Sequence, residues 1–224
     1  MNKIDFLEFE NKTFEEVKKR LSVRFLNISP LAELLENVPH RKVCDMETVC
    51  CLAFEDGENR SFLTVTKEML KKWRVAEDEL FRVAVANAAQ SDPPTMRPLI
   101  NVLCGFDADF DELEEEGKGE QFYIASTPDG VLGAKVILYP GFLAKAAEKL
   151  GGSFYLIPSS IHEFLLLPDT GDVEAEALTE MIHSINETQV SPEERLSDHP
   201  YRYDKDMKTI TSEGVEEKAI FVCA

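Results

Sequence analysis

Two apolar runs joined by a short polar insert constrain the fold of this chain more than any other stretch. The runs predict strands at Ser153–Ile157 and Ile161–Leu167, because both are rich in aromatic and branched side chains. The insert begins with Pro158 and holds two serines, which is typical of a turn. A third strand is expected at Ala134–Tyr139, where the side chains alternate well enough. We therefore predict a β-hairpin within a mostly antiparallel sheet.

Segments with helical spacing lie before and after this hairpin. Apolar side chains recur at helical intervals in Phe142–Leu150, which a pair of glycines ends, and in Val173–Thr188, for which Asp172 is the expected N-cap. Met96–Leu103 carries the same pattern and predicts a further helix. Together these elements predict an α+β fold in which amphipathic helices pack on a mostly antiparallel sheet.

An acidic stretch marks the expected boundary between two lobes. Seven of the ten residues from Asp107 to Glu116 carry carboxylates, and a charge run of this kind is typical of a solvated loop. We predict an N-terminal α+β lobe at residues 1–118 and a C-terminal α+β lobe at 119–224, with one continuous domain as the alternative.

The charge balance bears on the partners of the chain. There are 42 acidic and 24 basic residues, a net charge of −18. Such a surface repels phosphate backbones and anionic membranes, so we expect neither nucleic acid nor membrane as a partner. No apolar run approaches membrane-spanning length, and the five cysteines show no framework spacing. We expect most of the cysteines to be buried free thiols, leave the role of the vicinal Cys50-Cys51 pair open, and expect a cytoplasmic location.

Two segments imitate metal sites without completing them. Asp107, Asp109 and Asp111 resemble the start of an EF-hand loop, but the sixth and twelfth places hold Glu112 and Lys118 instead of glycine and glutamate. The Glu-x-x-His pattern that ends at His183 matches half of a di-iron site, of which the chain has no second copy. His183 also falls opposite the apolar stripe of its helix. We expect no specific metal and no cofactor.

A Ser–His pattern near the hairpin turn is the best candidate for catalysis. If Ile161–Leu167 is a regular strand, Ser160 and His162 share one face and can form a nucleophile–base pair, with Asp198 as a third group. However, the chain has no GxSxG elbow and no glycine-rich oxyanion loop beside these residues. We favour structural roles, in which the serines and Asp198 bond the backbone of turns.

Several segments together carry a resemblance to a known family. They are Val38–His40, Cys44–Met46, Gly133–Ala134 with Leu138–Tyr139, Leu156–Glu163, Met181–Ile182, Asn186–Thr188, and Leu196–Asp198 before Tyr201–Tyr203. The chain resembles, from Lys18 to Ile210, an uncharacterised domain of unknown function common in Gram-positive gut bacteria. The Pro-Ser-Ser-Ile-His-Glu segment is the most specific part. The resemblance implies no activity.

The sequence thus favours a non-catalytic cytoplasmic protein. We expect it to act through an unknown protein partner or as a homo-oligomer, because the catalytic motifs are absent and an acidic surface attracts basic partners. The alternative is a hydrolase-like enzyme built on Ser160 and His162.

Overall fold

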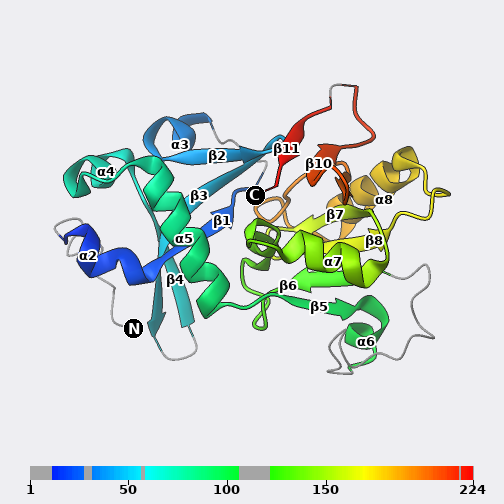
Figure 1. The fold of residues 1–224 in the computed structure, drawn as a ribbon, viewed down its shortest axis with the longest axis horizontal. Coiled ribbons are helices and arrows are strands. Elements are labelled where there is room, and N and C mark those ends of the chain that lie inside the picture. The colour runs from blue at the N-terminus through cyan, green and yellow to red at the C-terminus, as the bar shows by residue number, and fades with distance from the viewer. Residues whose placement is uncertain (1–11, 28–31, 57–58, 106–121, 217, 224) are drawn as a thin grey trace.

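The computed structural model describes residues 12–27, 32–56, 59–105, 122–216 and 218–223, in two open sheets with helices around them (Figure 1). In chain order the elements are α2 (Phe14–Val17), η1 (Lys18–Arg20), β1 (Leu21–Phe25), α3 (Ala32–Asn37), β2 (His40–Val43), β3 (Met46–Asp56), β4 (Asn59–Thr64), α4 (Lys67–Trp73), α5 (Glu77–Ser91), β5 (Thr95–Pro98), α6 (Leu99–Leu103), β6 (Tyr123–Ser126), η4 (Gly133–Leu138), α7 (Phe142–Leu150), β7 (Phe154–Ser160), β8 (Glu163–Pro168), α8 (Ala175–Thr188), β9 (Tyr201–Asp204), β10 (Thr209–Ser212) and β11 (Ile220–Val222).

The first sheet is built around the long strand β3. Antiparallel partners lie on both of its edges: β1 on one side, and β2 followed by β4 along the rest of its length. Helix α5 packs on this sheet through Leu80, Phe81, Ala84 and Ala88, which form one buried stripe. We call this sheet, with α2–α5, the N-terminal lobe.

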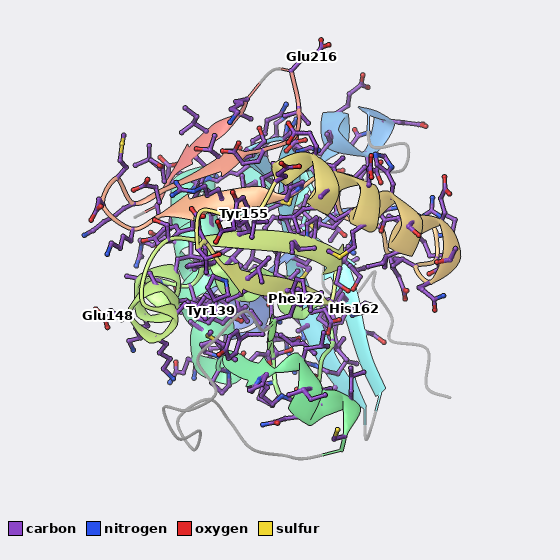
Figure 2. All side chains as sticks on the ribbon, turned by 90° about the vertical axis from the view of Figure 1, so that its right-hand side faces the viewer. Phe122, Tyr139, Glu148, Tyr155, His162 and Glu216 are labelled. Atoms are coloured by element: carbon purple, nitrogen blue, oxygen red, sulfur yellow. The ribbon has the colours of Figure 1, made fainter. Side chains whose placement is uncertain are left out.

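The second sheet has seven strands in the order β11-β10-β9-β7-β8-β6-β5, and every neighbouring pair is antiparallel. The predicted hairpin is its centre, formed by β7 and β8. The predicted turn is wrong in position, because residues 158–160 belong to β7 and the turn consists of residues 161 and 162. Helix α8 covers one face, where Leu178 and Ile182 pack against Tyr155 and Leu167 (Figure 2). We call this sheet, with α6–α8 and η4, the C-terminal lobe. The α+β fold is confirmed.

The strand predicted at Ala134–Tyr139 is wrong. This segment forms the 3₁₀-helix η4, which lies against β1 of one lobe and β6 and β8 of the other. Residues 133–137 are all buried, so their apolar character reflects burial on every side and not the two faces of a strand.

Two predicted helices also begin later than expected. The segment that begins at Met96 is first a strand, β5, and only the five residues after Pro98 are helical. Helix α8 starts at Ala175 with Glu174 as N-cap, two residues after the predicted cap at Asp172. The predicted helix end after Leu150 is confirmed, because Gly151 adopts the left-handed conformation of a C-cap.

One continuous core joins the two lobes, since a single cluster of buried side chains runs from Leu21 through Phe81 to Tyr203. A charge cluster crosses the same interface. The Lys135 ammonium, on a residue only 1% exposed, lies 2.7 Å from Asp92 Oδ2, and Arg60 bonds both Asp92 and Asp129. The division of the chain at residue 118 stays a prediction, and β5, which precedes it, belongs to the second sheet.

Candidate functional site

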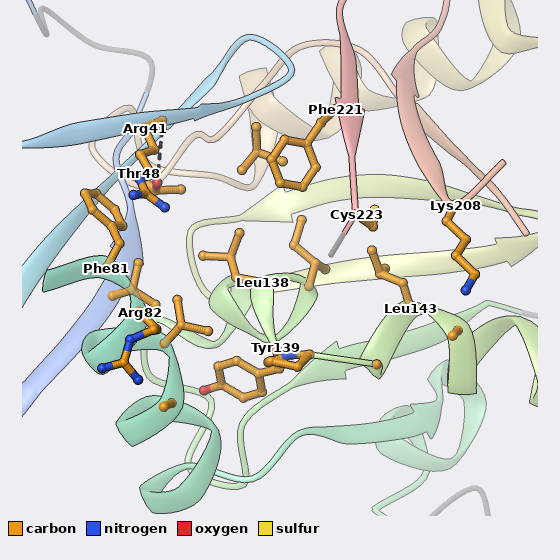
Figure 3. A pocket seen from close by; sticks show the side chains of 18 of the residues that line it. Arg41, Thr48, Phe81, Arg82, Leu138, Tyr139, Leu143, Lys208, Phe221 and Cys223 are labelled. Carbon is orange, nitrogen blue, oxygen red and sulfur yellow. Dashed lines mark hydrogen bonds between the residues drawn. The ribbon is translucent and has the colours of Figure 1, made fainter. Parts of the chain in front are cut away.

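A cavity of about 560 Å³ lies between the lobes (Figure 3). Its wall combines β1–β3 and α5 of the N-terminal lobe with η4, α7, β9, the β9–β10 connection and β11 of the C-terminal lobe. The lining residues are Val23, Arg41, Lys42, Val43, Thr48, Phe81, Arg82, Val85, Ala86, Ile137, Leu138, Tyr139, Pro140, Gly141, Leu143, Ala144, Tyr203, Lys208, Phe221 and Cys223. The volume falls within the range of about 300–1,000 Å³ that is typical of small-molecule sites.

The middle of the cavity is apolar. Leu138 of η4, Leu143 of α7 and Phe221 of β11 project into it (Figure 3). Two polar groups of the wall are already bonded within the protein: the Tyr139 hydroxyl donates to Asp92 O at 3.1 Å, and Thr48 Oγ1 donates to Arg41 O at 2.9 Å. A ligand in this space therefore gains mainly from apolar burial.

Positive charge surrounds this apolar space. Of the lining residues that the structure describes, four are cationic and none is acidic, although acidic residues outnumber basic ones in the whole chain. The Arg41 guanidinium stacks over the Phe81 ring at 4.5 Å and pairs with Asp78, which does not line the cavity. Arg82 is bonded to Glu79 at 2.7 Å.

Tyr203 and Cys223 form part of the wall near β11. Burial raises the pKa of the Tyr203 hydroxyl, and the nearby Cys223 and Asp204 raise it further. Burial likewise raises the pKa of the Cys223 thiol to about 11, so this thiol is protonated at neutral pH and is a poor nucleophile. Neither group supplies an anion inside the cavity.

The sequence-predicted Ser160 and His162 lie elsewhere, at the hairpin turn. Figure 2 shows His162 on the side opposite Glu148 of α7, and neither predicted residue lines the cavity. His162 occupies the two-residue turn, so it is not in a strand. The Ser160 hydroxyl accepts the backbone N–H of His162 at 3.0 Å, while Nδ1 of the ring accepts from Leu132 N at 3.1 Å.

The second ring nitrogen of His162 faces a carboxylate, with Nε2 3.5 Å from Glu194 Oε1. Asp198, the predicted third group, accepts a hydrogen bond at 2.8 Å from the side chain of the buried Asn186 on α8. Ser160 thus forms a hydrogen bond with a backbone amide, and Asp198 forms one with an amide side chain. Within the described residues, no hydrogen bond joins either of them to the His162 ring.

A polar cluster that the sequence did not indicate lies at the turn between β2 and β3. The Tyr201 hydroxyl lies 2.7 Å from Asp45 Oδ1 and 2.9 Å from Ser197 Oγ, and His199 Nε2 lies 3.3 Å from Asp45 Oδ2. Burial alone would raise the pKa of Asp45, but its contacts with His199 and Tyr201 outweigh that effect and lower the pKa. Ser197 is only 3% exposed, so this cluster joins the lobes without offering an accessible nucleophile.

The part of the chain that the structure describes holds neither a cluster of metal ligands nor a helix able to cross a membrane. No group of three or more His, Cys, Asp or Glu side chains within it could hold a metal ion. The acidic stretch that imitates an EF-hand lies outside the described residues, and His183 is exposed on α8, as predicted. Among the helices described, none has the length and apolar character that crossing a bilayer requires.

Sequence reasoning missed the cavity because its wall has no local signature. The lining residues come from segments between Val23 and Cys223, and none of these segments contains a binding motif. Only the fold brings them together.

Comparison with known proteins places the chain in a family. No curated protein and no solved structure matches it. The model of DUF5688, described as a family of unknown function, matches residues 2–205, and this range includes most of the cavity wall and the hairpin turn. The chain therefore belongs to the DUF5688 family.

Proposed function

We propose that this protein is a non-catalytic binding protein that holds a small, mainly apolar molecule in the cavity between its lobes. The observation that carries the proposal is the cavity itself: an apolar space of about 560 Å³ whose wall is contributed by both lobes. Apolar surface left open to water is unfavourable, so a space of this kind favours an occupant.

A binding role fits the chemistry of the wall better than catalysis does. The thiol of Cys223 is held protonated, and the hydroxyls of Tyr139 and Thr48 are committed to backbone carbonyls. Among the described residues of the wall there is no histidine and no carboxylate to act as a general base. These features support binding without turnover.

The test uses Nile red, a neutral dye whose emission shifts to shorter wavelength in apolar surroundings. We expect one dye per chain, and loss of that binding in Ala144→Phe, because Ala144 lines the cavity and a phenyl group would occupy it. Lys145→Phe is the matched control, since Lys145 is the exposed neighbour on α7 and does not line the cavity. Equal dye binding by both variants, with native-like melting curves, would contradict the proposal.

The expectation of a protein partner or a second copy stays part of this proposal. Ile220 and Val222 on the edge strand β11 are 67% and 70% exposed, which supports an additional contact at that edge. Light scattering after gel filtration tests for self-association, and Val222→Lys should weaken it.

We also keep the cytoplasm as the proposed location. All five cysteines are free, as expected for a reducing compartment. Fractionation of cells that produce the tagged protein tests this location.

A further inference from the structure

Hydrogen-bond donors without partners gather at one end of the cavity. Lys208 forms no ion pair within the described residues, and the Tyr203 hydroxyl has no hydrogen-bond partner among them, although Tyr203 is only 2% exposed. The Tyr203 side chain neighbours Cys223, whose N–H donates to Lys208 O at 2.9 Å. Both donors therefore lie on the β11 side of the cavity.

The cations at the other end are already compensated. Figure 3 shows Arg41 and Arg82 together on the Phe81 side, away from Lys208 and Leu143. Both arginines pair with carboxylates of α5. A ligand anion would have to compete with those carboxylates there, whereas at Lys208 it meets an uncompensated charge.

The backbone conformation at residue 208 indicates that the turn itself does not require a lysine at this position. Its φ is 53°, a left-handed conformation that glycine and asparagine adopt more readily. A turn selected only for its shape would favour one of those residues. The conformation is also consistent with the strain often found at binding sites.

We propose that the cavity binds an amphipathic carboxylate with a slender alkyl chain, whose carboxylate is held by Lys208 and the Tyr203 hydroxyl. This inference rests on the proposed function and names the chemical class of its ligand. The alkyl chain lies along Leu138, Leu143 and Phe221. One ammonium and one hydroxyl match the two oxygens of a carboxylate, while a phosphate group would call for more donors.

The overall negative charge of the protein does not oppose this arrangement. None of the cavity-lining side chains in the described ranges is a carboxylate, and interactions between exposed charges are screened beyond about 8–10 Å at physiological ionic strength. The N-terminus of α7 lies in the same wall as Lys208, and its partial positive charge adds to the local potential.

Competition against bound Nile red provides the test. Decanoate and decan-1-ol have the same alkyl chain, so their difference reports the carboxylate alone. We expect decanoate to displace the dye at a concentration about tenfold lower, the ratio expected for one charge-assisted hydrogen bond. Decyl phosphate should compete less well than decanoate.

Three variants locate the carboxylate. Lys208→Gln should abolish the preference for decanoate, and Tyr203→Phe should reduce it to about threefold. Both variants should melt like the parent protein, which shows that they are folded, and each displacement is measured against the variant's own affinity for Nile red. Lys205→Gln is the matched control: Lys205 is a lysine of the same β9–β10 connection that does not line the cavity.

The outcomes separate this inference from the proposed function. Absence of Nile red binding in the parent protein removes the proposed function and this inference with it. If the dye binds and decanoate and decan-1-ol displace it equally well, only the claim that the ligand carries a carboxylate is overturned. If Arg82→Gln loses the preference for decanoate over decan-1-ol and Lys208→Gln keeps it, the carboxylate does not bind at the Lys208 end of the cavity. If decyl phosphate competes more strongly than decanoate, the assignment of a carboxylate as the head group is overturned.

Discussion

Replacing Gly133 by alanine tests how closely η4 approaches the hairpin turn and β6. A Cβ atom at this position would lie 2.1 Å from Ser126 Oγ, 2.6 Å from His162 O and 2.7 Å from Thr127 N. Two of these atoms belong to the backbone and cannot rotate away. The same methyl group would disturb the hydrogen bond that Ser126 Oγ donates to His162 O at 2.8 Å.

The expected loss of stability follows from three contributions. Overpacking typically costs about 1–3 kcal/mol, and losing a buried hydrogen bond costs about 1 kcal/mol more. Alanine restricts the unfolded chain and returns about 0.4–1 kcal/mol, because the backbone of Gly133 is not in the left-handed region. The net loss is about 1–3.5 kcal/mol, which lowers the melting temperature by about 2–14 °C for a chain of this length.

Urea titration and thermal melts of two variants check this value. Gly152→Ala is the control, because a Cβ atom there meets nothing within 4 Å and its φ is not positive. It should stay within about 0.5 kcal/mol of the parent. If Gly133→Ala has the same melting temperature as Gly152→Ala, the close approach of η4 to the hairpin is refuted.

Three further predictions follow from the polar groups and the thiols. Asp198→Ala should lower stability by about 0.5–1.5 kcal/mol in urea titrations, since it removes the acceptor of Asn186, and Asp198→Asn should cost less. The pKa of Asp45 is lowered in the folded state. Its contribution to stability is therefore present above its unfolded pKa and is lost as the pH falls through the lower, folded pKa. The stability difference between the parent and Asp45→Asn should shrink between pH 5 and pH 3. With a thiol reagent, the native protein should react rapidly at the exposed Cys104 alone and Cys104→Ser should remove that phase, because burial raises the pKa of the other four thiols.

Much of the fold could be predicted where the sequence has one clear period. Helix α8 is confirmed, because a helix with one exposed face shows that face in its sequence. The hairpin formed by β7 and β8 is confirmed although residues 154–158 are all buried, because aromatic and branched side chains on both sides of a polar insert favour strands. The segment Ala134–Tyr139 lacks this information. It is enclosed between the lobes, and an apolar segment buried on every side does not distinguish a strand from a helix.

The candidate site could not be predicted, for a different reason. Lys208 and Tyr203 lie close in sequence, but another part of the cavity wall comes from η4 and α7, more than fifty residues earlier in the chain. Ser160 and His162 are predicted as a pair because they lie two residues apart in the sequence. In the structure this short spacing makes the backbone N–H of His162 the partner of the Ser160 hydroxyl, and the imidazole bonds other residues.

The charge cluster between the lobes also bears on how a ligand would enter and leave. If the lobes opened like a hinge, the Lys135 ammonium would lose its ion pair with Asp92 while apolar side chains still surround it. Such a motion is strongly unfavourable, because it leaves a buried charge without a partner. Exchange should therefore use a local motion. The short edge strand β11, which carries Phe221 and pairs with a neighbour on one side only, is the part of the wall that opens at least cost. Residence times would then depend on the fraying of this strand, and a substitution that strengthens its pairing with β10 would slow ligand release without changing any group that contacts the ligand.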